Sequence, residues 1–121
     1  MITDNVHYIY HIWFKTVRFA KRNYGLSTNC VLVLNAAYIY NKINYKPFTR
    51  FQLIKFATYY SHSKIGKYIT VLTVKGFLDV ADKWRCYDRY IISPEGIKVI
   101  NDLHTSYQEQ LSLFIDKYNI E

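Results

Sequence analysis

The segment from Ser61 to Gly96 constrains the fold of this 121-residue chain more than any other stretch. Its first part places Ile65, Ile69 and Leu72 at steps of four and three residues, a spacing typical of the buried face of a helix. Many of its residues are β-branched and favour a strand by propensity alone. The helical spacing and the glycine at Gly76, which suits a helix end, favour a helix over 61–75.

The second part of the segment indicates a β-hairpin followed by another helix. The runs 77–81 and 87–92 are β-prone, and the polar segment 82–86 between them is the expected loop. Ser93 is a suitable helix cap, and Pro94 fits the first helical turn, where its missing N–H costs nothing. The segment therefore predicts a helix, a hairpin and a capped helix in that order.

Three further helices are expected before this segment. The first should be capped by Asp4 or Asn5 and end at Gly25, and the second should run over about 29–41 after a cap at Ser27 or Thr28. Thr49 follows a short extended piece and should cap a third helix over about 50–58. The complete order predicts a mainly α fold with a small β-hairpin wing, which is a winged helix-turn-helix.

The net charge of +7 is concentrated in the middle of the chain. Residues 42–89 carry ten Lys and Arg against three Asp, a net charge of +7, whereas 1–41 carry +3 and 90–121 carry −3. A basic field over the predicted winged helix favours a polyanionic partner. A basic surface that serves only solubility is the alternative that composition leaves open.

Composition narrows the class of protein. Half of the residues are hydrophobic, which predicts a packed domain. The two cysteines, Cys30 and Cys86, are too few for a disulfide framework and are expected to be reduced thiols. No apolar run is long enough to span a membrane, and the first residues do not resemble a signal peptide, so we expect a soluble, cytoplasmic protein without membrane contact.

The first and last helices have more apolar surface than one small domain is expected to bury. In the last helix, apolar residues recur at steps of three and four from Ile100 onward. This surplus predicts a homodimer formed through residues 1–25 and 94–121. The expected interface residues are Ile9, Trp13, Val17, Leu103, Tyr107, Leu111, Phe114 and Tyr118.

Two short motifs resemble the winged-helix core of the MarR family of regulators. Lys75-Gly76-Phe77-Leu78 is similar to the glycine-hydrophobic pair that ends that family's recognition helix. Ile92-Ser93-Pro94-Glu95-Gly96 is similar to the Leu-Thr-x-x-Gly signal that follows its wing. The resemblance covers roughly residues 27–118. The wing departs from the family pattern, because this chain has Asp82-Lys83-Trp84-Arg85 where the family usually has Asp-x-Arg-Arg.

The resemblance implies a dimeric transcriptional regulator, most simply a repressor, that binds double-stranded DNA. In this interpretation the chain is one domain, with a DNA-binding core over 27–93 between the dimerisation helices. Helix 61–75 would read the major groove and wing 77–92 would contact flanking DNA. The candidate DNA-binding residues are Thr49, Arg50, Ser61, His62, Ser63, Lys64, Lys67, Tyr68, Lys83, Arg85 and Arg89.

Several other functions can be compared with DNA binding on the same residues. A small phage-type or mobile-element-type protein could use a winged helix to bind another protein, so a protein partner stays open. The resemblance is compatible with a small-molecule effector, but no residue pattern supports one. His7 and His11 lie four residues apart, but no further ligand completes a metal site. No catalytic arrangement is present, and we expect neither an enzyme nor a cofactor.

Overall fold

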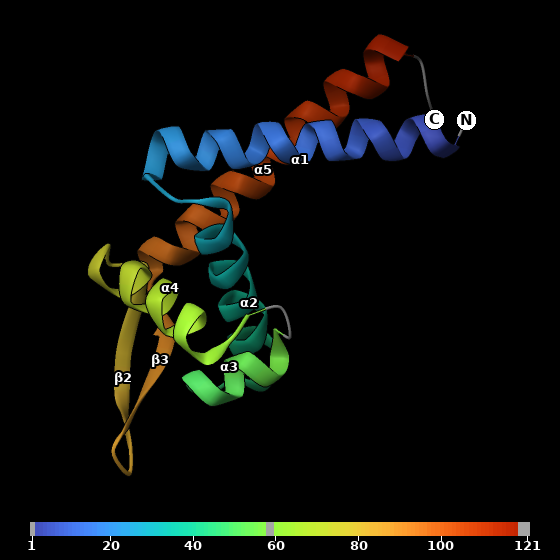
Figure 1. Ribbon diagram of the computed structural model, residues 1–121. Coiled ribbons are helices and arrows are strands. Elements are labelled where there is room, and N and C mark those ends of the chain that lie inside the picture. The colour runs from blue at the N-terminus through green and yellow to red at the C-terminus, as the bar shows by residue number, and fades with distance from the viewer. Residues whose placement is uncertain (1, 58–59, 119–121) are drawn as a thin grey trace.

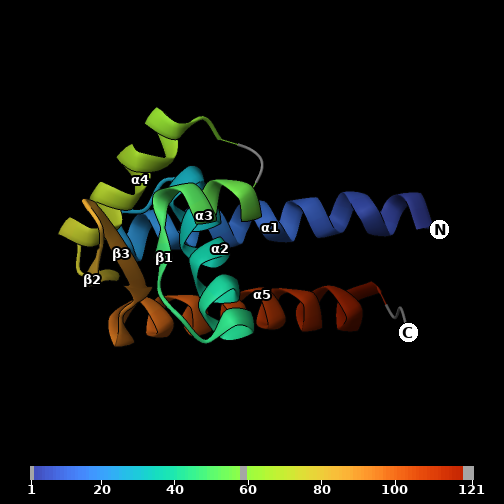
Figure 2. The same cartoon turned by 90° about the horizontal axis from the view of Figure 1, so that it is seen from below.

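Over the described residues, the structure is a mainly α winged helix of five helices and a small antiparallel sheet, and the β2–β3 hairpin projects from the helices (Figures 1 and 2). The computed structural model describes residues 2–57 and 60–118, without the side chains of 2–6 and 118. The elements are α1 (Ile2–Tyr24), α2 (Thr28–Asn44), β1 (Phe48–Thr49), α3 (Arg50–Phe56), α4 (His62–Val74), β2 (Leu78–Trp84), β3 (Tyr87–Ile92) and α5 (Pro94–Tyr118). The strand order is β1-β3-β2.

Local capping explains where most helices begin and end. The hydroxyls of Ser27, Thr49 and Ser61 accept hydrogen bonds from backbone amides in the first turns of α2, α3 and α4. Thr49 forms a full capping box, since Gln52 also accepts from the backbone N–H of Thr49. Gly25 and Gly76 follow α1 and α4 with positive φ angles, as helix ends require. These starts and stops confirm the sequence predictions.

Two helix boundaries were predicted wrongly. Helix α1 already begins at Ile2, so Asp4 and Asn5 lie inside it and neither is its cap. Helix α2 continues to Asn44, three residues beyond the predicted end. It stops there because Tyr45 adopts a left-handed conformation and its amide donates to the carbonyl of Asn41.

The hairpin is longer than its sequence suggested. The predicted loop 82–86 is largely strand, and only Arg85 and Cys86 form the turn. Asp82 pairs with Arg89 across the two strands, and Trp84 pairs with Tyr87. Opposite charges and aromatic rings at directly opposed positions stabilise a ladder, which explains its extension through polar sequence.

The core forms around the inner face of α4. Ile65, Ile69 and Leu72 are almost completely buried, as their spacing predicted. Phe48 on β1 is also fully buried, with the ring of Tyr40 at 5.6 Å. Apolar burial of this kind stabilises a domain by about 25 cal/mol per Å². The helical interpretation of α4 is thereby confirmed over its strand alternative.

The two motifs that carried the family resemblance contact one another. The hydroxyl of Ser93 donates to the carbonyl of Gly76 at 2.6 Å and accepts from the amide of Gly96 at 3.0 Å. The Ser93 amide donates to the carbonyl of Phe77 at 3.1 Å. A Cβ on Gly96 would overlap that same carbonyl oxygen and lie 2.8 Å from Ile92 Cγ1. This junction joins the end of α4, the base of the hairpin and the start of α5.

Helices α1 and α5 pack on each other and extend together beyond the rest of the chain (Figure 2). The Tyr24 hydroxyl at the end of α1 donates to the Asp102 carboxylate on α5. This hydrogen bond, with some burial, raises the pKa of Tyr24 to about 12. The rings of Tyr8 and Phe114 meet at 4.2 Å farther along the pair. We call this helix pair the α1–α5 arm.

None of the helices over the described residues is both long enough and apolar enough to cross a membrane.

The junction predicts that Gly96→Ala lowers the free energy of unfolding by about 3 kcal/mol, because the new methyl group has no space beside Phe77. Gly76→Ala is the matched comparison. Its Cβ would meet nothing within 4 Å, so only the positive φ angle should cost stability, about 1–2 kcal/mol. Urea denaturation measures both. An unchanged unfolding midpoint for Gly96→Ala would contradict the packing described for this junction.

Candidate nucleic-acid interface

The outer face of α4 presents the polar side chains that the sequence singled out. His62, Ser63, Lys64 and Lys67 are all exposed, opposite the buried face of the helix. Ser61 caps the helix, and its hydroxyl lies 3.3 Å from that of Ser63. The start of α4 therefore combines exposed cations with hydroxyls and the positive end of a helix dipole, which suits an anionic ligand.

Tyr68, predicted to contact DNA, also makes contacts within the protein. It is half-buried, and its hydroxyl accepts from the side-chain amide of Asn29 on α2 at 2.9 Å. Its ring lies 5.3 Å from that of Tyr60, whose hydroxyl donates to the other end of the Asn29 amide at 3.0 Å. Tyr68 therefore attaches α4 to α2, and only part of its surface is available to a ligand.

At the start of α3, the two predicted contact residues differ. Arg50 is exposed, and its guanidinium lies 5.4 Å above the ring of Phe51. It also covers Gly66 on α4, where a Cβ would meet Nη1 at 3.0 Å. Thr49 is only 6% exposed, and its hydroxyl is used in the capping box. Its assignment as a DNA contact is corrected: Thr49 holds the start of α3.

The wing presents two of its three predicted cations. Lys83 and Arg85 are exposed, and the Arg85 guanidinium lies 4.6 Å above the Trp84 ring at the hairpin turn. Arg89 instead forms a two-pronged ion pair with Asp82. This hydrogen bonding lowers the pKa of Asp82 and raises that of Arg89. Arg89 therefore supports the wing through this ion pair, and its role as a DNA contact stays a prediction.

Aromatic contacts connect the three parts of this surface. The ring of Phe51 on α3 lies 5.1 Å from that of His62 on α4 and 4.9 Å from that of Tyr87 on the wing. Neither Phe51 nor Tyr87 was among the residues that the sequence singled out. The available signal was the number of aromatic residues near the basic ones, since interleaved rings and cations are typical of nucleic-acid surfaces.

These elements lie on one side of the molecule. Figure 1 shows the start of α4, helix α3 and the hairpin on the side opposite α1. The exposed cations of these elements include Arg50, Lys64, Lys67, Lys83 and Arg85. We call this surface the α4–wing face. It can offer an elongated anion several positive contacts at once.

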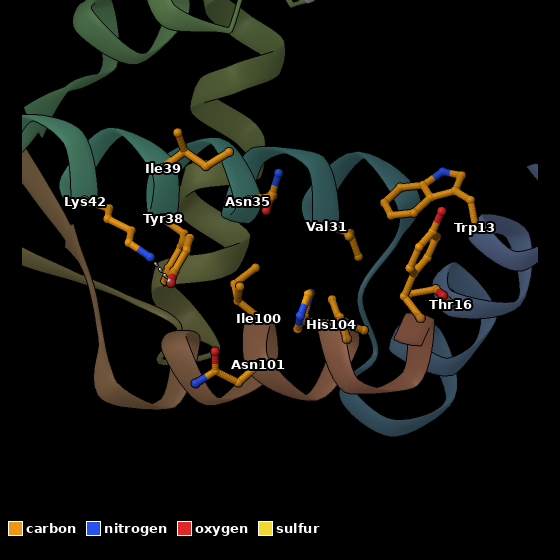
Figure 3. Close-up of a pocket in the computed structure, with 12 residues that line it drawn as sticks. Trp13, Thr16, Val31, Asn35, Tyr38, Ile39, Lys42, Ile100, Asn101 and His104 are labelled. Atoms are coloured by element: carbon orange, nitrogen blue, oxygen red, sulfur yellow. Dashed lines mark hydrogen bonds between the residues drawn. The ribbon is translucent and has the colours of Figure 1, made fainter. Parts of the chain in front are cut away.

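A separate cavity of about 680 Å³ lies between α1, α2 and α5. In Figure 3, side chains of α2 and α5 line it from opposite sides, with Trp13 near one end and Lys42 near the other. The Lys42 ammonium donates to the Tyr38 hydroxyl at 3.4 Å. No residue pattern in the sequence predicted a ligand for this cavity.

The arm buries more of its own apolar surface than the sequence suggested. Leu103 is 6% exposed and belongs to the core, so its assignment to a subunit interface is corrected. The predicted interface residues Trp13, Val17, Tyr107, Leu111 and Phe114 are half-buried within the chain. Ile9 is exposed, whereas the side chain of Tyr118 lies outside the described residues.

Other apolar residues of the arm are more exposed and were not singled out. Tyr10 and Phe14 on α1 have exposed fractions of 66% and 57%. Leu113 on α5 is 62% exposed, and Ile115 is exposed as well. These residues fall between those of the predicted helical stripe. The apolar residues predicted at helical spacing lie on the side of α5 that faces α1. The exposed apolar residues Leu113 and Ile115 lie next to that side.

Both cysteines are free thiols, with Cys30 buried and Cys86 exposed at the wing turn. Over residues 2–57 and 60–118, no group of three or more His, Cys, Asp or Glu side chains is placed to hold a metal ion.

Solved structures share this architecture. Staphylococcus aureus MepR, described as a transcription regulator of the multidrug efflux pump MepA, matches with a TM-score of 0.74 over 89% of this chain and 76% of its own, at 11% identity. A mutant MepR bound to an oligodeoxyribonucleotide matches with a TM-score of 0.78 at 12% identity, over 96% and 83% of the two chains. The chain has the MarR-like winged-helix fold. MarR from Escherichia coli, in its apo form, matches with a TM-score of 0.66 at 10% identity, over 97% and 84% of the two chains.

No protein-family model matches the sequence, and comparison with curated proteins finds no match. The likeness to MarR-like structures is therefore one of fold. It confirms the fold that the two motifs implied, and it assigns no role to individual residues.

Proposed function

We propose that this protein is a dimeric transcriptional regulator that binds double-stranded DNA through the α4–wing face. The observation that carries the proposal is the position of Lys64 and Lys67. Both are exposed on the outer face of α4, on the same side of the molecule as the cations of the wing. In a winged helix, this arrangement suits insertion of α4 into a major groove while the wing contacts flanking DNA.

The role of each group follows from its chemistry. Lys64 and Lys67 carry flexible ammonium groups suited to phosphates, while Ser61, His62 and Ser63 at the start of α4 can hydrogen-bond base edges. Lys83 and Arg85 would contact the backbone or the adjacent minor groove. Repression is the simplest outcome, since a protein that occupies a promoter excludes other proteins from it. The MepR structure with an oligodeoxyribonucleotide supports DNA as the partner.

The proposed dimer would form through the α1–α5 arm. Apolar residues stay exposed on both helices of the arm, and the arm extends past the rest of the chain, where a second copy has access to it. Pairing of two arms would bury Phe14 and Leu113. It would also present two α4 helices to successive half-sites of a two-fold-symmetric DNA site.

The DNA proposal predicts that Lys64→Glu and Lys67→Glu each weaken binding to a duplex by at least about fivefold, and reduce the salt dependence of binding by about one released counterion or more. Titration of a labelled random-sequence duplex at several salt concentrations measures both effects. Lys15→Glu is the matched control, because Lys15 is exposed on α1, away from the α4–wing face. No binding of the unmodified protein to any duplex at low salt would refute the proposal.

The dimer proposal predicts that Leu113→Glu shifts the protein to monomers, because it places a charge in the proposed apolar contact between arms. Light scattering should give about twice the chain mass of 14.5 kDa for the unmodified protein and the single chain mass for the variant. Ile43→Glu on α2 is the control, since Ile43 is equally exposed, at 62%, but lies outside the arm. A monomeric unmodified protein would contradict the dimer.

A further inference from the structure

A hollow of about 480 Å³ opens between the wing and the start of α3, within the α4–wing face. Its walls are the aromatic rings of Phe51, Trp84 and Tyr87, and its polar lining comes from Thr49, Gln52 and Arg89. Trp84 and Tyr87 remain 50% and 40% exposed beside it. In the proposed function, α4 reads the groove and the wing cations contact phosphates. These three rings have no role in it.

The rings are arranged for contact with a flat partner. The rings of Trp84 and Tyr87 are nearly parallel, at 22°, with centroids 6.5 Å apart. Phe51 packs edge-on against Tyr87 at 86° and so fixes the side of the hollow nearest α3. Trp84 and Tyr87 are directly opposed residues of the hairpin, so the ladder holds them in place. A nucleobase offers each ring a flat face at about 3.4 Å, the usual separation of stacked bases.

The polar groups of the hollow match the edges of a base. Gln52 is held in one orientation, because its side-chain oxygen accepts from the Thr49 amide at 2.8 Å. Its NH₂ group has no hydrogen-bond partner among the described residues and can donate to a ring nitrogen or carbonyl of a ligand. A planar group with acceptor atoms on its edge fits this combination of rings and donor.

Positive charge next to the rings indicates that the base belongs to an anionic strand. Arg50 lies above the ring of Phe51, and Arg85 above that of Trp84. Lys83 precedes Trp84 and is also exposed. Phosphates on either side of a bound base would meet these cations. An apolar protein segment could cover the rings, but it would offer no counter-charge to Arg50 and Arg85, which lie above two of those rings.

We propose that this hollow binds an unpaired base of a nucleic-acid strand, by stacking on Trp84 and Tyr87, with the neighbouring phosphates on Arg50, Lys83 and Arg85. The base must be unpaired, because bases within a duplex have both faces covered by their neighbours. This second binding mode rests on the proposed function in taking a nucleic acid as the partner. The two binding modes differ in whether the bases are paired. Helix α4 reads paired DNA, whereas the wing binds single-stranded DNA or an unpaired position next to the duplex.

The test uses the full-length protein with a short oligothymidylate and, in parallel, a mixed-sequence duplex. Tryptophan fluorescence should be quenched by oligothymidylate, and this quenching should be lost in Trp84→Leu. Trp84→Leu and Tyr87→Leu should each weaken oligothymidylate binding by about fivefold or more, the loss of at least one stacking contact. Trp84→Leu should affect duplex binding much less, since the ring contact of Phe51 that supports the wing is to Tyr87. The same pair of measurements with an oligouridylate shows whether DNA or RNA is preferred.

Phe56→Leu is the matched control, because Phe56 is an exposed ring on the same helix α3 but packs against Tyr40, outside the hollow. It should leave both affinities unchanged. Urea denaturation of each variant shows that the exposed substitutions preserve the fold.

The outcomes separate this inference from the proposed function. Binding to duplex with no Trp84-dependent binding to oligothymidylate overturns the inference and leaves the function standing. Quenching by duplex as strong as that by oligothymidylate also overturns it, since the rings would then have no preference for unpaired bases. Trp84-dependent binding to oligothymidylate without duplex binding supports the inference and refutes the proposed reading of double-stranded DNA.

Discussion

The contact between Ser93 and the chain around Gly76 is the interaction on which the rest of this structure depends. One hydroxyl links the end of α4 to the start of α5, and the glycine at position 96 allows the helix backbone to reach the carbonyl of Phe77. The base of the hairpin is enclosed in the same junction. The direction in which the wing leaves the body is therefore coupled to the end of α4 and to the path of α5 into the arm.

This coupling has a functional consequence. A protein that contacts DNA with a helix and a wing together needs the two at a fixed separation, because groove and backbone positions in a duplex are fixed. The junction fixes the separation at the base of the hairpin. Near the tip of the hairpin, Phe51 of α3 also fixes this separation, because its ring contacts His62 on α4 and Tyr87 on the wing. The exposed cations of the α4–wing face are thereby held on a rigid support, which reduces the entropy lost on binding.

Features set by neighbouring residues could be predicted from the sequence. The caps at Thr49, Ser61 and Ser93 and the buried face of α4 follow from side chains within one or two helical turns. The hairpin was predicted too short because its last pairs, including Asp82 with Arg89, depend on residues on opposite strands. The same cross-strand pairing joins the Arg89 side chain to Asp82, a contact that no local pattern indicates.

The arm shows a second limit of sequence reasoning. Helical spacing correctly identified α5 as amphipathic, but it could not indicate whether its apolar side faces this chain or another. Leu103 packs into the core and Phe114 meets Tyr8, so part of the surface assigned to a partner is covered within the chain. Phe51 and Tyr87 were missed for a related reason, since their joint position beside the wing exists only after α3 and the hairpin have packed together.

Amide chemical-shift mapping by NMR during titration with a short duplex tests the central claim most directly, because it locates DNA on the surface without any substitution. The account predicts that the perturbed amides cluster at the start of α4, at the start of α3 and in the wing, while those of α2 near Ile43 stay unchanged. Perturbations confined to other surfaces, or none at low salt, would contradict it.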